Sequence, residues 1–395
     1  MPTGAARFRT PTVLLLLMAA AVPLSNGTWM ALINNFAVER AAFSGADMGL
    51  LQSLREIPGL LSFTAIFLLF FLREQTLAVV SLLLLGIGTS LAGFFPSFWG
   101  LVCTTMLMSI GFHYFETANQ SLQLQWLKKE MAAAIMGRLI SAGAFAALAI
   151  YGLIFLVLKL GGLPLEWGFV LGGGLTALIA LFAWLFFPTF PEEVRQHRRL
   201  LMRRRYWLYY ALTFMAGARR QIFIVFAGFL MVEKFGFDAA SISLMFLVNM
   251  ALNMVAAPRL GRLIGRWGER RSLTVEYLGL FVVFSAYAVV DTAWLAVILY
   301  IVDHLFFTLA IAMKTYFQKI ADPADHAPTA GVAFSINHIA AVVIPALFGL
   351  LWLISPAAVF LAGAALAAGS LLLARLIPTH PEPGREVIMP ASKGV

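Results

Sequence analysis

The chain has 395 residues, of which 61% are hydrophobic and only 12% are charged, with a mean hydropathy of +0.88. These values exclude a disordered protein and a soluble enzyme, because a soluble core cannot hide so much apolar surface. The net charge of +9 does not indicate nucleic-acid binding, since the charges stand in short segments between apolar runs, where they act as topology signals.

Twelve apolar segments follow one another along the chain. A run of about 20 apolar residues crosses about 30 Å of hydrocarbon as a helix, and only helices or closed barrels satisfy their backbone there. Arg7 and Arg9 precede the first segment, as in a secretory signal, but this segment continues to about Phe36 and eleven more follow. The sequence therefore predicts an all-α integral membrane protein. The predicted spans are 11–36, 45–71, 76–95, 98–126, 131–159, 163–188, 206–232, 239–266, 272–290, 293–319, 328–354 and 356–377.

A polar stretch from about Pro188 to Arg205 divides the spans into two sets of six. The two sets resemble each other, because Val38-Glu39-Arg40 returns as Val232-Glu233-Lys234 and the pattern His-x-Phe-x-Thr at 113–117 returns at 304–308. These matches indicate two pseudo-symmetric six-helix bundles. The predicted parts are an N-terminal bundle (1–190), a cytoplasmic central loop (191–204), a C-terminal bundle (205–378) and a disordered cytoplasmic tail (379–395).

The distribution of basic residues predicts the orientation. With both termini in the cytoplasm, 20 of the 28 Lys and Arg residues lie on the cytoplasmic side, and the opposite loops keep only Arg40, Lys159 and Lys234. This bias follows the positive-inside rule. We therefore expect an integral protein of a bacterial inner (plasma) membrane with both termini in the cytoplasm.

The fourth span carries a polar stripe, since His113, Glu116, Gln120 and Gln123 follow one another at intervals of three, four and three residues. Such a stripe faces a water-filled cavity or a partner helix. Glu116 lies near the middle of the span, where burial favours the protonated form of a carboxyl group. It is the first candidate for a proton carrier, and the alternative is a fixed salt bridge with an arginine.

The seventh span contains the adjacent residues Arg219 and Arg220, which cannot share a helix face. We expect one of them to line a cavity as an anchor for an anion, and the other to pair with a carboxylate or to reach the rim. Arg138 in the fifth span either holds substrate or, as we favour, neutralises Glu116 or Glu56.

The remaining polar residues inside spans lie in the second half of the chain. Asp303 in the tenth span is the second candidate for a proton carrier, and its neighbour His304 points elsewhere and is expected to pack. Lys314 either pairs with a carboxylate or binds an anion. His338 either titrates or packs, and Asn249 and Asn253 line the pathway or bridge helices.

No metal site or cofactor is expected, because the histidines show no local ligand pair such as His-x-x-x-His and Cys103 is the only cysteine. No G-x-x-x-x-G-K-[ST] motif is present, so an ion gradient or the gradient of the substrate must supply the energy. No nucleophile–base set indicates an enzyme.

The segment between the eighth and ninth spans reads Gly261-Arg262-Leu263-Ile264-Gly265-Arg266-Trp267-Gly268-Glu269-Arg270-Arg271. This segment resembles the loop signature G-x-L-x-[DG]-R-x-G-x-[RK]-[RK] of the major facilitator superfamily. The expected roles are close helix approach at two glycines, a tight turn at the third and cytoplasmic anchoring by arginines. The predicted gating-loop residues are Gly261, Gly265, Arg266, Gly268, Arg270 and Arg271.

The resemblance covers about residues 10–378. The first copy of the loop, expected between the second and third spans, is degraded to Phe71-Leu72-Arg73-Glu74-Gln75, and the proline-glycine signature of many drug/proton antiporters is missing from the fifth span. The resemblance implies a secondary transporter whose two bundles rock about a central cavity, with spans 1, 4, 7 and 10 lining the pathway.

The charged residues assigned to the membrane interior, away from the cytoplasmic ends of the spans, favour an anionic substrate, because five are basic and four are acidic. They are Arg55, Arg138, Arg219, Arg220 and Lys314, and Glu56, Glu116, Glu276 and Asp303. The sequence therefore predicts a monomeric, proton-coupled transporter of a small organic anion, surrounded by membrane lipid. The alternatives are efflux of amphipathic drug-like compounds, a lipid-translocating protein and a sensor of the same fold. The candidate substrate-binding residues are Arg219, Arg220, Arg138, Lys314, His113, Gln120, Asn249, Asn253 and His338.

Overall fold

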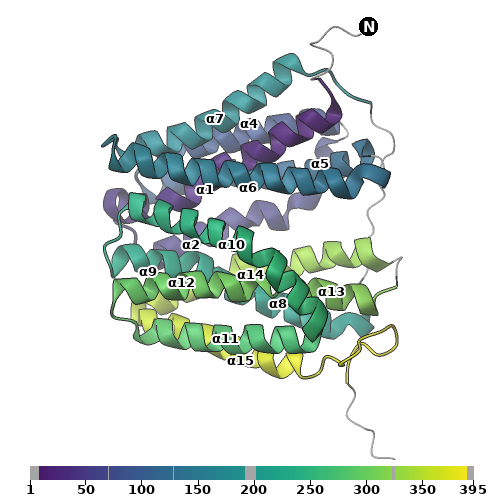
Figure 1. The fold of residues 1–395 in the computed structure, drawn as a ribbon. Coiled ribbons are helices and arrows are strands. Elements are labelled where there is room, and N and C mark those ends of the chain that lie inside the picture. Colours follow the sequence, from purple (N-terminus) through teal and green to yellow (C-terminus); the bar gives the residue numbers. More distant parts are fainter. Residues whose placement is uncertain (1–8, 70, 128, 192–201, 323–324, 389–395) are drawn as a thin grey trace, which may run out of the picture. The chain divides into compact units, whose positions relative to one another are not determined.

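The computed structural model describes residues 9–69, 71–127, 129–191, 202–322 and 325–388, and these residues are almost entirely helical (Figure 1). The helices of the first half are α1 (Pro11–Ala41), α2 (Gly45–Leu60), α3 (Ala65–Leu68), α4 (Glu74–Ala92), α5 (Phe98–Trp126), α6 (Lys129–Lys159) and α7 (Leu165–Phe186). Those of the second half are α8 (Trp207–Gln221), α9 (Gly228–Glu233), α10 (Ala239–Trp267), α11 (Glu269–Val289), α12 (Ala293–Thr308), α13 (Ile311–Ile320), α14 (His326–Ile354) and α15 (Pro356–Ala374).

Eleven helical stretches in the described part of the chain are long and apolar enough to cross a membrane. The expected second span, 45–71, is the exception, because it is divided into α2, the short 3-10 helix η2 (Ser62–Thr64) and α3. Pro58 stands two residues before the end of α2, and proline removes a backbone donor near that end. With this divided segment the chain has the twelve membrane segments, in two pseudo-symmetric sets of six, that the sequence predicts.

The seventh span is continuous but not uniform. The short 3-10 helix η3 (Arg204–Tyr206) leads into α8, and the π-helical segment η4 (Ile222–Ala227) joins α8 to α9. A π-helical segment inside an α-helix is rare and frequently marks a functional position. It begins directly after the pair Arg219 and Arg220 and the following Gln221, so the backbone is irregular next to the two arginines.

The chain divides into two compact units. The first comprises Met1–Asp47, Leu54–His197 and Gly236–Met250, and the second comprises Met48–Ser53, Arg198–Phe235 and Ala251–Val395. The predicted bundles differ from these units mainly in two short segments, since Met48–Ser53 belongs to the second unit and Gly236–Met250 to the first. The predicted bundle boundaries stay predictions. The predicted central loop, 191–204, falls mostly outside the described residues.

In the first unit, α4 packs against both α5 and α7, and α1 packs against α6 and α7. Glycines allow these close approaches: a Cβ atom on Gly111 of α5 would lie 2.4 Å from the backbone nitrogen of Leu85 in α4. Small residues that bring backbones together are typical of helix packing in membranes.

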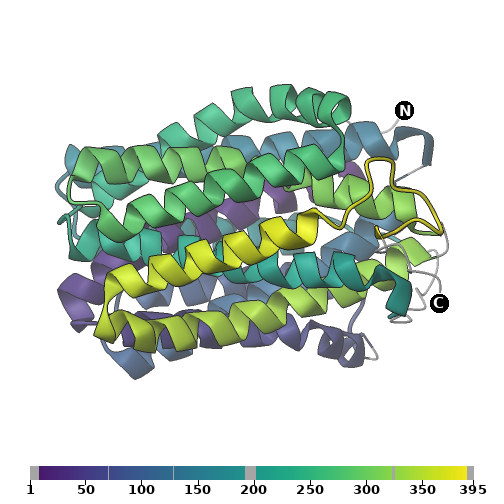
Figure 2. The same cartoon turned by 90° about the horizontal axis from the view of Figure 1, so that it is seen from below.

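In the second unit, α11 packs along α15, and α8 packs against α14 and α15. Figure 2 shows the yellow α15 beside the green α11. An aromatic cluster that includes Tyr206, Tyr209, Tyr277, Tyr316 and Phe317 fills the core near the start of α8. These helices hold the charged residues that form the candidate site.

The C-terminal tail is ordered up to residue 388, so the prediction of disorder from 379 onward is wrong for this stretch. The Ile388 N–H donates to the Leu376 carbonyl at 2.8 Å, and the Tyr316 hydroxyl donates to the Glu386 carbonyl at 2.6 Å. Val387 packs against the aromatic cluster. Backbone hydrogen bonds and one apolar contact, which composition does not reveal, hold the tail; residues 389–395 lie outside the described part.

Candidate functional site: a buried charge cluster

Arg219 is the largest charged side chain in the interior of the second unit. It lies near the end of α8 and is 0% exposed, whereas its neighbour Arg220 is exposed. This difference confirms that the two arginines occupy different faces, because consecutive residues on a helix are turned by about 100°. Arg219 therefore takes the second of the two expected roles, pairing with a carboxylate.

Three contacts hold the Arg219 guanidinium. Nη2 lies 3.7 Å from Oε1 of Glu276 in α11, and Nη1 donates a hydrogen bond to the Ser370 hydroxyl in α15. The Arg219 Cζ atom lies over the Tyr277 ring, 4.4 Å from its centroid. A guanidinium stacks on aromatic rings and is more weakly hydrated than an ammonium group, which suits arginine to this interior position.

Asp303 in α12 completes the cluster. It is 0% exposed and interacts electrostatically with both Arg219 and Glu276. Neither carboxylate oxygen of Asp303, and neither of Glu276, has a hydrogen-bond partner among the described residues. Buried carboxylates are usually hydrogen-bonded, so four oxygens without such partners stand out.

The charges of this cluster do not balance if every group is ionised. One guanidinium and two carboxylates sum to −1, in a place where no side chain is exposed. An isolated buried charge is strongly unfavourable, and a buried carboxyl group escapes this cost by taking up a proton. One proton shared between Glu276 and Asp303 makes the cluster neutral, so the arrangement is chemically able to bind and release a proton.

The first unit contains a smaller charge pair. Arg55 Nη2 lies 2.6 Å from Glu56 Oε1, and the Arg55 guanidinium lies 5.0 Å from the centre of the Trp29 ring. Arg138 is exposed and forms no ion pair with any residue that the structure describes. The favoured expectation that Arg138 neutralises Glu56 or Glu116 is therefore wrong for this structure, since Glu56 pairs with its own neighbour and Arg138 stays exposed.

The polar stripe of the fourth span lies on α5. His113 is buried, Glu116 is half-buried and Gln120 is exposed. Gln123, the last residue of the stripe, is half-buried. Glu116 forms no ion pair with the described residues, so the alternative to a proton carrier, a fixed salt bridge with an arginine, is not seen there.

The other predicted residues of the second half take varied positions. Asn253 accepts a hydrogen bond of 3.2 Å from Thr308, so it bridges α10 and α12. His338 is buried and its Nδ1 lies 2.9 Å from the Phe334 carbonyl, and His304 packs on the Phe223 ring as expected. Asn249 is buried and Lys314 is exposed.

The predicted gating loop joins α10 to α11. Gly268 has a φ of 76°, a left-handed conformation that favours glycine, so the expected tight turn is present. The expectation that Gly261 and Gly265 permit close helix approach is not met, because a Cβ atom on either would meet nothing within 4 Å. Both glycines lie in the last turns of α10 and are exposed. Arg266 and Arg271 are exposed and Arg270 is half-buried.

Sequence reasoning missed two members of the cluster, Tyr277 and Ser370. It counted Glu276 among the membrane carboxylates but did not pair it with Arg219. No local signal exists for this pairing, because the three partners of Arg219 stand on α11 and α15, far away in the sequence. The only usable hint was the presence of a charge in an apolar span.

Comparisons with known proteins agree with this architecture. A family model described as Major Facilitator Superfamily matches residues 14–345 and 210–393. A mutant of the nucleoside transporter NupG is similar in structure, with a TM-score of 0.77 and 14% identity over 93% of this chain and 99% of that one. A bacterial homolog of the human lysosomal transporter Spinster, in an inward-facing and occupied conformation, is also similar in structure, with a TM-score of 0.74 and 14% identity. The match covers 99% of this chain and 100% of that one. No curated protein sequence matches the chain.

Proposed function

The chain belongs to the Major Facilitator Superfamily, and from this membership we propose that it is a secondary active transporter that moves a small organic anion by alternating access, coupled to protons. Members of this family are transporters, so the proposal adds the substrate class and the coupling ion. The likeness to NupG and to the Spinster homolog concerns the fold alone at 14% identity and selects no substrate.

The observation that carries the anionic substrate is the exposure of cations inside membrane segments. Arg220 lies near the middle of a 30-residue span and is exposed, as is Lys314 within its span, and Arg138 is exposed at the first residue of its apolar span. A charge facing lipid at the bilayer centre costs at least about 2.5–3.5 kcal/mol. These side chains therefore face water, where a guanidinium or ammonium group binds carboxylate or phosphate.

The buried cluster supports coupling to protons. Glu276 pairs with the Arg219 guanidinium, and Asp303 interacts electrostatically with both. Neither carboxylate has a hydrogen-bond partner among the described residues, and one proton balances the charge of the cluster. Glu116, half-buried on α5, is a second place where a proton could be carried. A buried carboxylate that lacks a compensating cation takes up a proton to become neutral, and releasing this proton restores the charge. Such a change of charge can couple proton movement to a change in structure.

The proposal includes the setting of the protein. It acts as a monomer in a bacterial inner membrane, with both termini in the cytoplasm, without a cofactor, and with a small molecule and protons as its partners. The excess of basic residues in the loops assigned to the cytoplasm supports this orientation.

A thermal-shift screen tests the substrate class. Purified protein is heated with a library of organic anions and lipophilic cations at acidic and neutral pH, together with the variants Arg220→Gln and Arg375→Gln. Arg375 is an exposed arginine at the end of α15 and serves as the matched control. We expect stabilisation by particular anions that is lost in Arg220→Gln and kept in Arg375→Gln.

Stabilisation by hydrophobic cations alone would contradict the anionic substrate. That result would favour the alternative function, efflux of amphipathic drug-like compounds. Equal losses in the two variants would show that anions bind to diffuse positive charge and not to a site near Arg220.

A further inference from the structure

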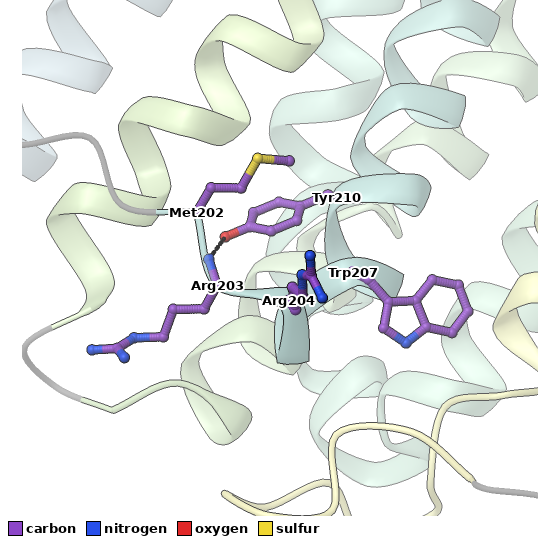
Figure 3. Close-up of a pocket in the computed structure, with 5 residues that line it drawn as sticks. All are labelled: Met202, Arg203, Arg204, Trp207 and Tyr210. Atoms are coloured by element: carbon purple, nitrogen blue, oxygen red, sulfur yellow. Dashed lines mark hydrogen bonds between the residues drawn. The ribbon is translucent and has the colours of Figure 1, made fainter.

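A pocket of about 580 Å³ opens at the start of the seventh span. It is lined by Met202, Arg203, Arg204, Trp207 and Tyr210, which belong to one short stretch of chain (Figure 3). None of these residues has a role in the proposed transport cycle. The pocket therefore needs its own explanation.

The two arginines of the pocket differ in their charge balance. Arg203 Nε lies 2.5 Å from Asp325 Oδ2, and Arg203 Nη2 donates to Asp325 Oδ1 at 2.9 Å. This bidentate pair holds the pKa of the Asp325 carboxyl group below its usual value, chiefly through the hydrogen bond from Arg203. Arg203 thus has its charge satisfied and serves as part of the pocket wall.

Arg204 has no such partner. Its side chain is exposed, and it forms no ion pair with the described residues. In Figure 3 the Arg203 side chain extends away from Trp207, whereas Arg204 is drawn between Tyr210 and Trp207. The backbone N–H of Arg203 donates to the Tyr210 hydroxyl at 3.3 Å, which fixes the tyrosine ring as the opposite wall. Arg204 is therefore the arginine of the pocket that forms no ion pair with the described residues, and it lies next to the two aromatic residues of the lining.

The pocket lies where the chain enters the membrane. The apolar helical stretch of the seventh span begins at Arg204, so Arg204 lies at its polar end and Trp207 follows one turn further along. The side chains of Trp207 and Met202 are 47% and 69% exposed. Tryptophan is enriched at membrane interfaces, where its ring contacts apolar groups and its indole N–H reaches polar ones.

We propose that this pocket binds the phosphate group of an anionic phospholipid. The Arg204 guanidinium holds the phosphate oxygens, the Trp207 indole N–H donates a second hydrogen bond, and the rings of Trp207 and Tyr210 with Met202 contact the glycerol and the first carbons of the acyl chains. A guanidinium and an aromatic donor at a membrane boundary match a headgroup that is charged on one side and apolar on the other.

A soluble phosphate ester fits the pocket less well. Only one of its two arginines is free of an ion pair with described residues, and most of its wall is apolar. A single exposed cation binds a free anion weakly, because water screens the attraction. A lipid adds contacts between its apolar part and the aromatic wall. The amphiphilic ligand is therefore the one that uses every part of the pocket.

The test measures tryptophan fluorescence of the full-length protein in lipid nanodiscs. Brominated phosphatidylglycerol quenches tryptophans that it touches, and brominated phosphatidylcholine controls for lipid without net charge. The chain has nine tryptophans, so Trp207→Phe identifies the part of the signal that belongs to the pocket. Arg204→Gln removes the proposed phosphate ligand, and Arg375→Gln removes an exposed arginine outside the pocket.

We expect Trp207 to be quenched at a lower fraction of phosphatidylglycerol than of phosphatidylcholine. Because one arginine near an anionic membrane strengthens binding about fivefold, Arg204→Gln should raise the fraction needed for half-quenching by about fivefold or more. Arg375→Gln should leave that fraction unchanged.

Three results would overturn the proposal. Equal quenching by the two lipids would show that the headgroup is not recognised. Equal effects of Arg204→Gln and Arg375→Gln would show general attraction to a charged surface. Displacement of the lipid by glycerol 3-phosphate at equal concentration would assign the pocket to a soluble phosphate ester.

Discussion

The ion pair between Arg219 and Glu276 leads to a quantitative prediction. Both side chains are almost completely buried, and their charged atoms are 3.7 Å apart. At an effective dielectric constant of about 20, two unit charges at this distance attract each other by about 4.5 kcal/mol. Replacing Arg219 by methionine removes the guanidinium and leaves Glu276 and Asp303 together, which changes the charge of the ionised cluster from −1 to −2.

We expect Arg219→Met to lower the free energy of unfolding by about 3–5 kcal/mol, because removing one partner of a buried pair leaves the other charge without compensation. The double variant Arg219→Met with Glu276→Met restores the cluster charge to −1 and should regain most of this loss. Arg220→Met changes an exposed arginine of the same helix and should cost little. Titration of the purified protein from detergent into SDS measures the three differences.

The comparison of the single and double variants decides the interpretation. If the double variant is as unstable as Arg219→Met, or less stable, then Arg219 stabilises the unit through Tyr277 and Ser370 and not through its charge. If Arg220→Met is equally destabilising, the burial of Arg219 has no special role. Either result would refute the argument from charge balance.

Two further predictions concern other parts of the chain. The pKa of Asp325 is lowered in the folded protein, chiefly because of its hydrogen bond with Arg203. The ionised carboxylate therefore stabilises the fold, and this stabilisation is fully present above the unfolded pKa of about 4. It is lost as the pH falls through the lower pKa of the folded protein. The melting temperature of Asp325→Asn should therefore fall below that of the wild type at neutral pH and approach it in acid; a constant difference would refute the linkage. Gly111→Ala places a methyl group against the backbone of α4 and should lower the free energy of unfolding by about 1–3 kcal/mol. In Gly174→Ala the added methyl group meets no atom within 4 Å, so this variant should be tolerated. Equal melting temperatures for the two variants would contradict the close approach of α5 to α4.

The membrane architecture could be predicted from the sequence because it depends on local properties. Apolar length fixes each span, and the polar stretch after the sixth span separates the halves. The division of the second span was not predicted, although Pro58 and the charged residues of α2 were visible in the sequence. Proline also occurs inside α1 and α14, which continue through it, so its presence alone does not show where a helix ends.

The candidate site could be predicted only in part. Charged residues in apolar segments were recognised at once, because each carries a large cost of burial. Which of them pair was not predictable, since Arg219 meets Glu276 and Ser370 only after α8, α11 and α15 pack together. The role assigned to Gly261 and Gly265 failed for a related reason: a glycine indicates close approach only where another segment packs against it, and a Cβ atom on either would meet no described atom within 4 Å.

Transport by purified protein in liposomes tests the central claim most directly. The vesicles receive an imposed pH gradient, and movement of an anion identified by the thermal-shift screen is followed for the wild type, Asp303→Asn and Glu116→Gln. The proposed function predicts accumulation of the anion that follows the pH gradient, and loss of this accumulation in at least one variant while exchange of the anion continues. Accumulation that is the same with and without the gradient, or unchanged in both variants, would contradict coupling of transport to protons.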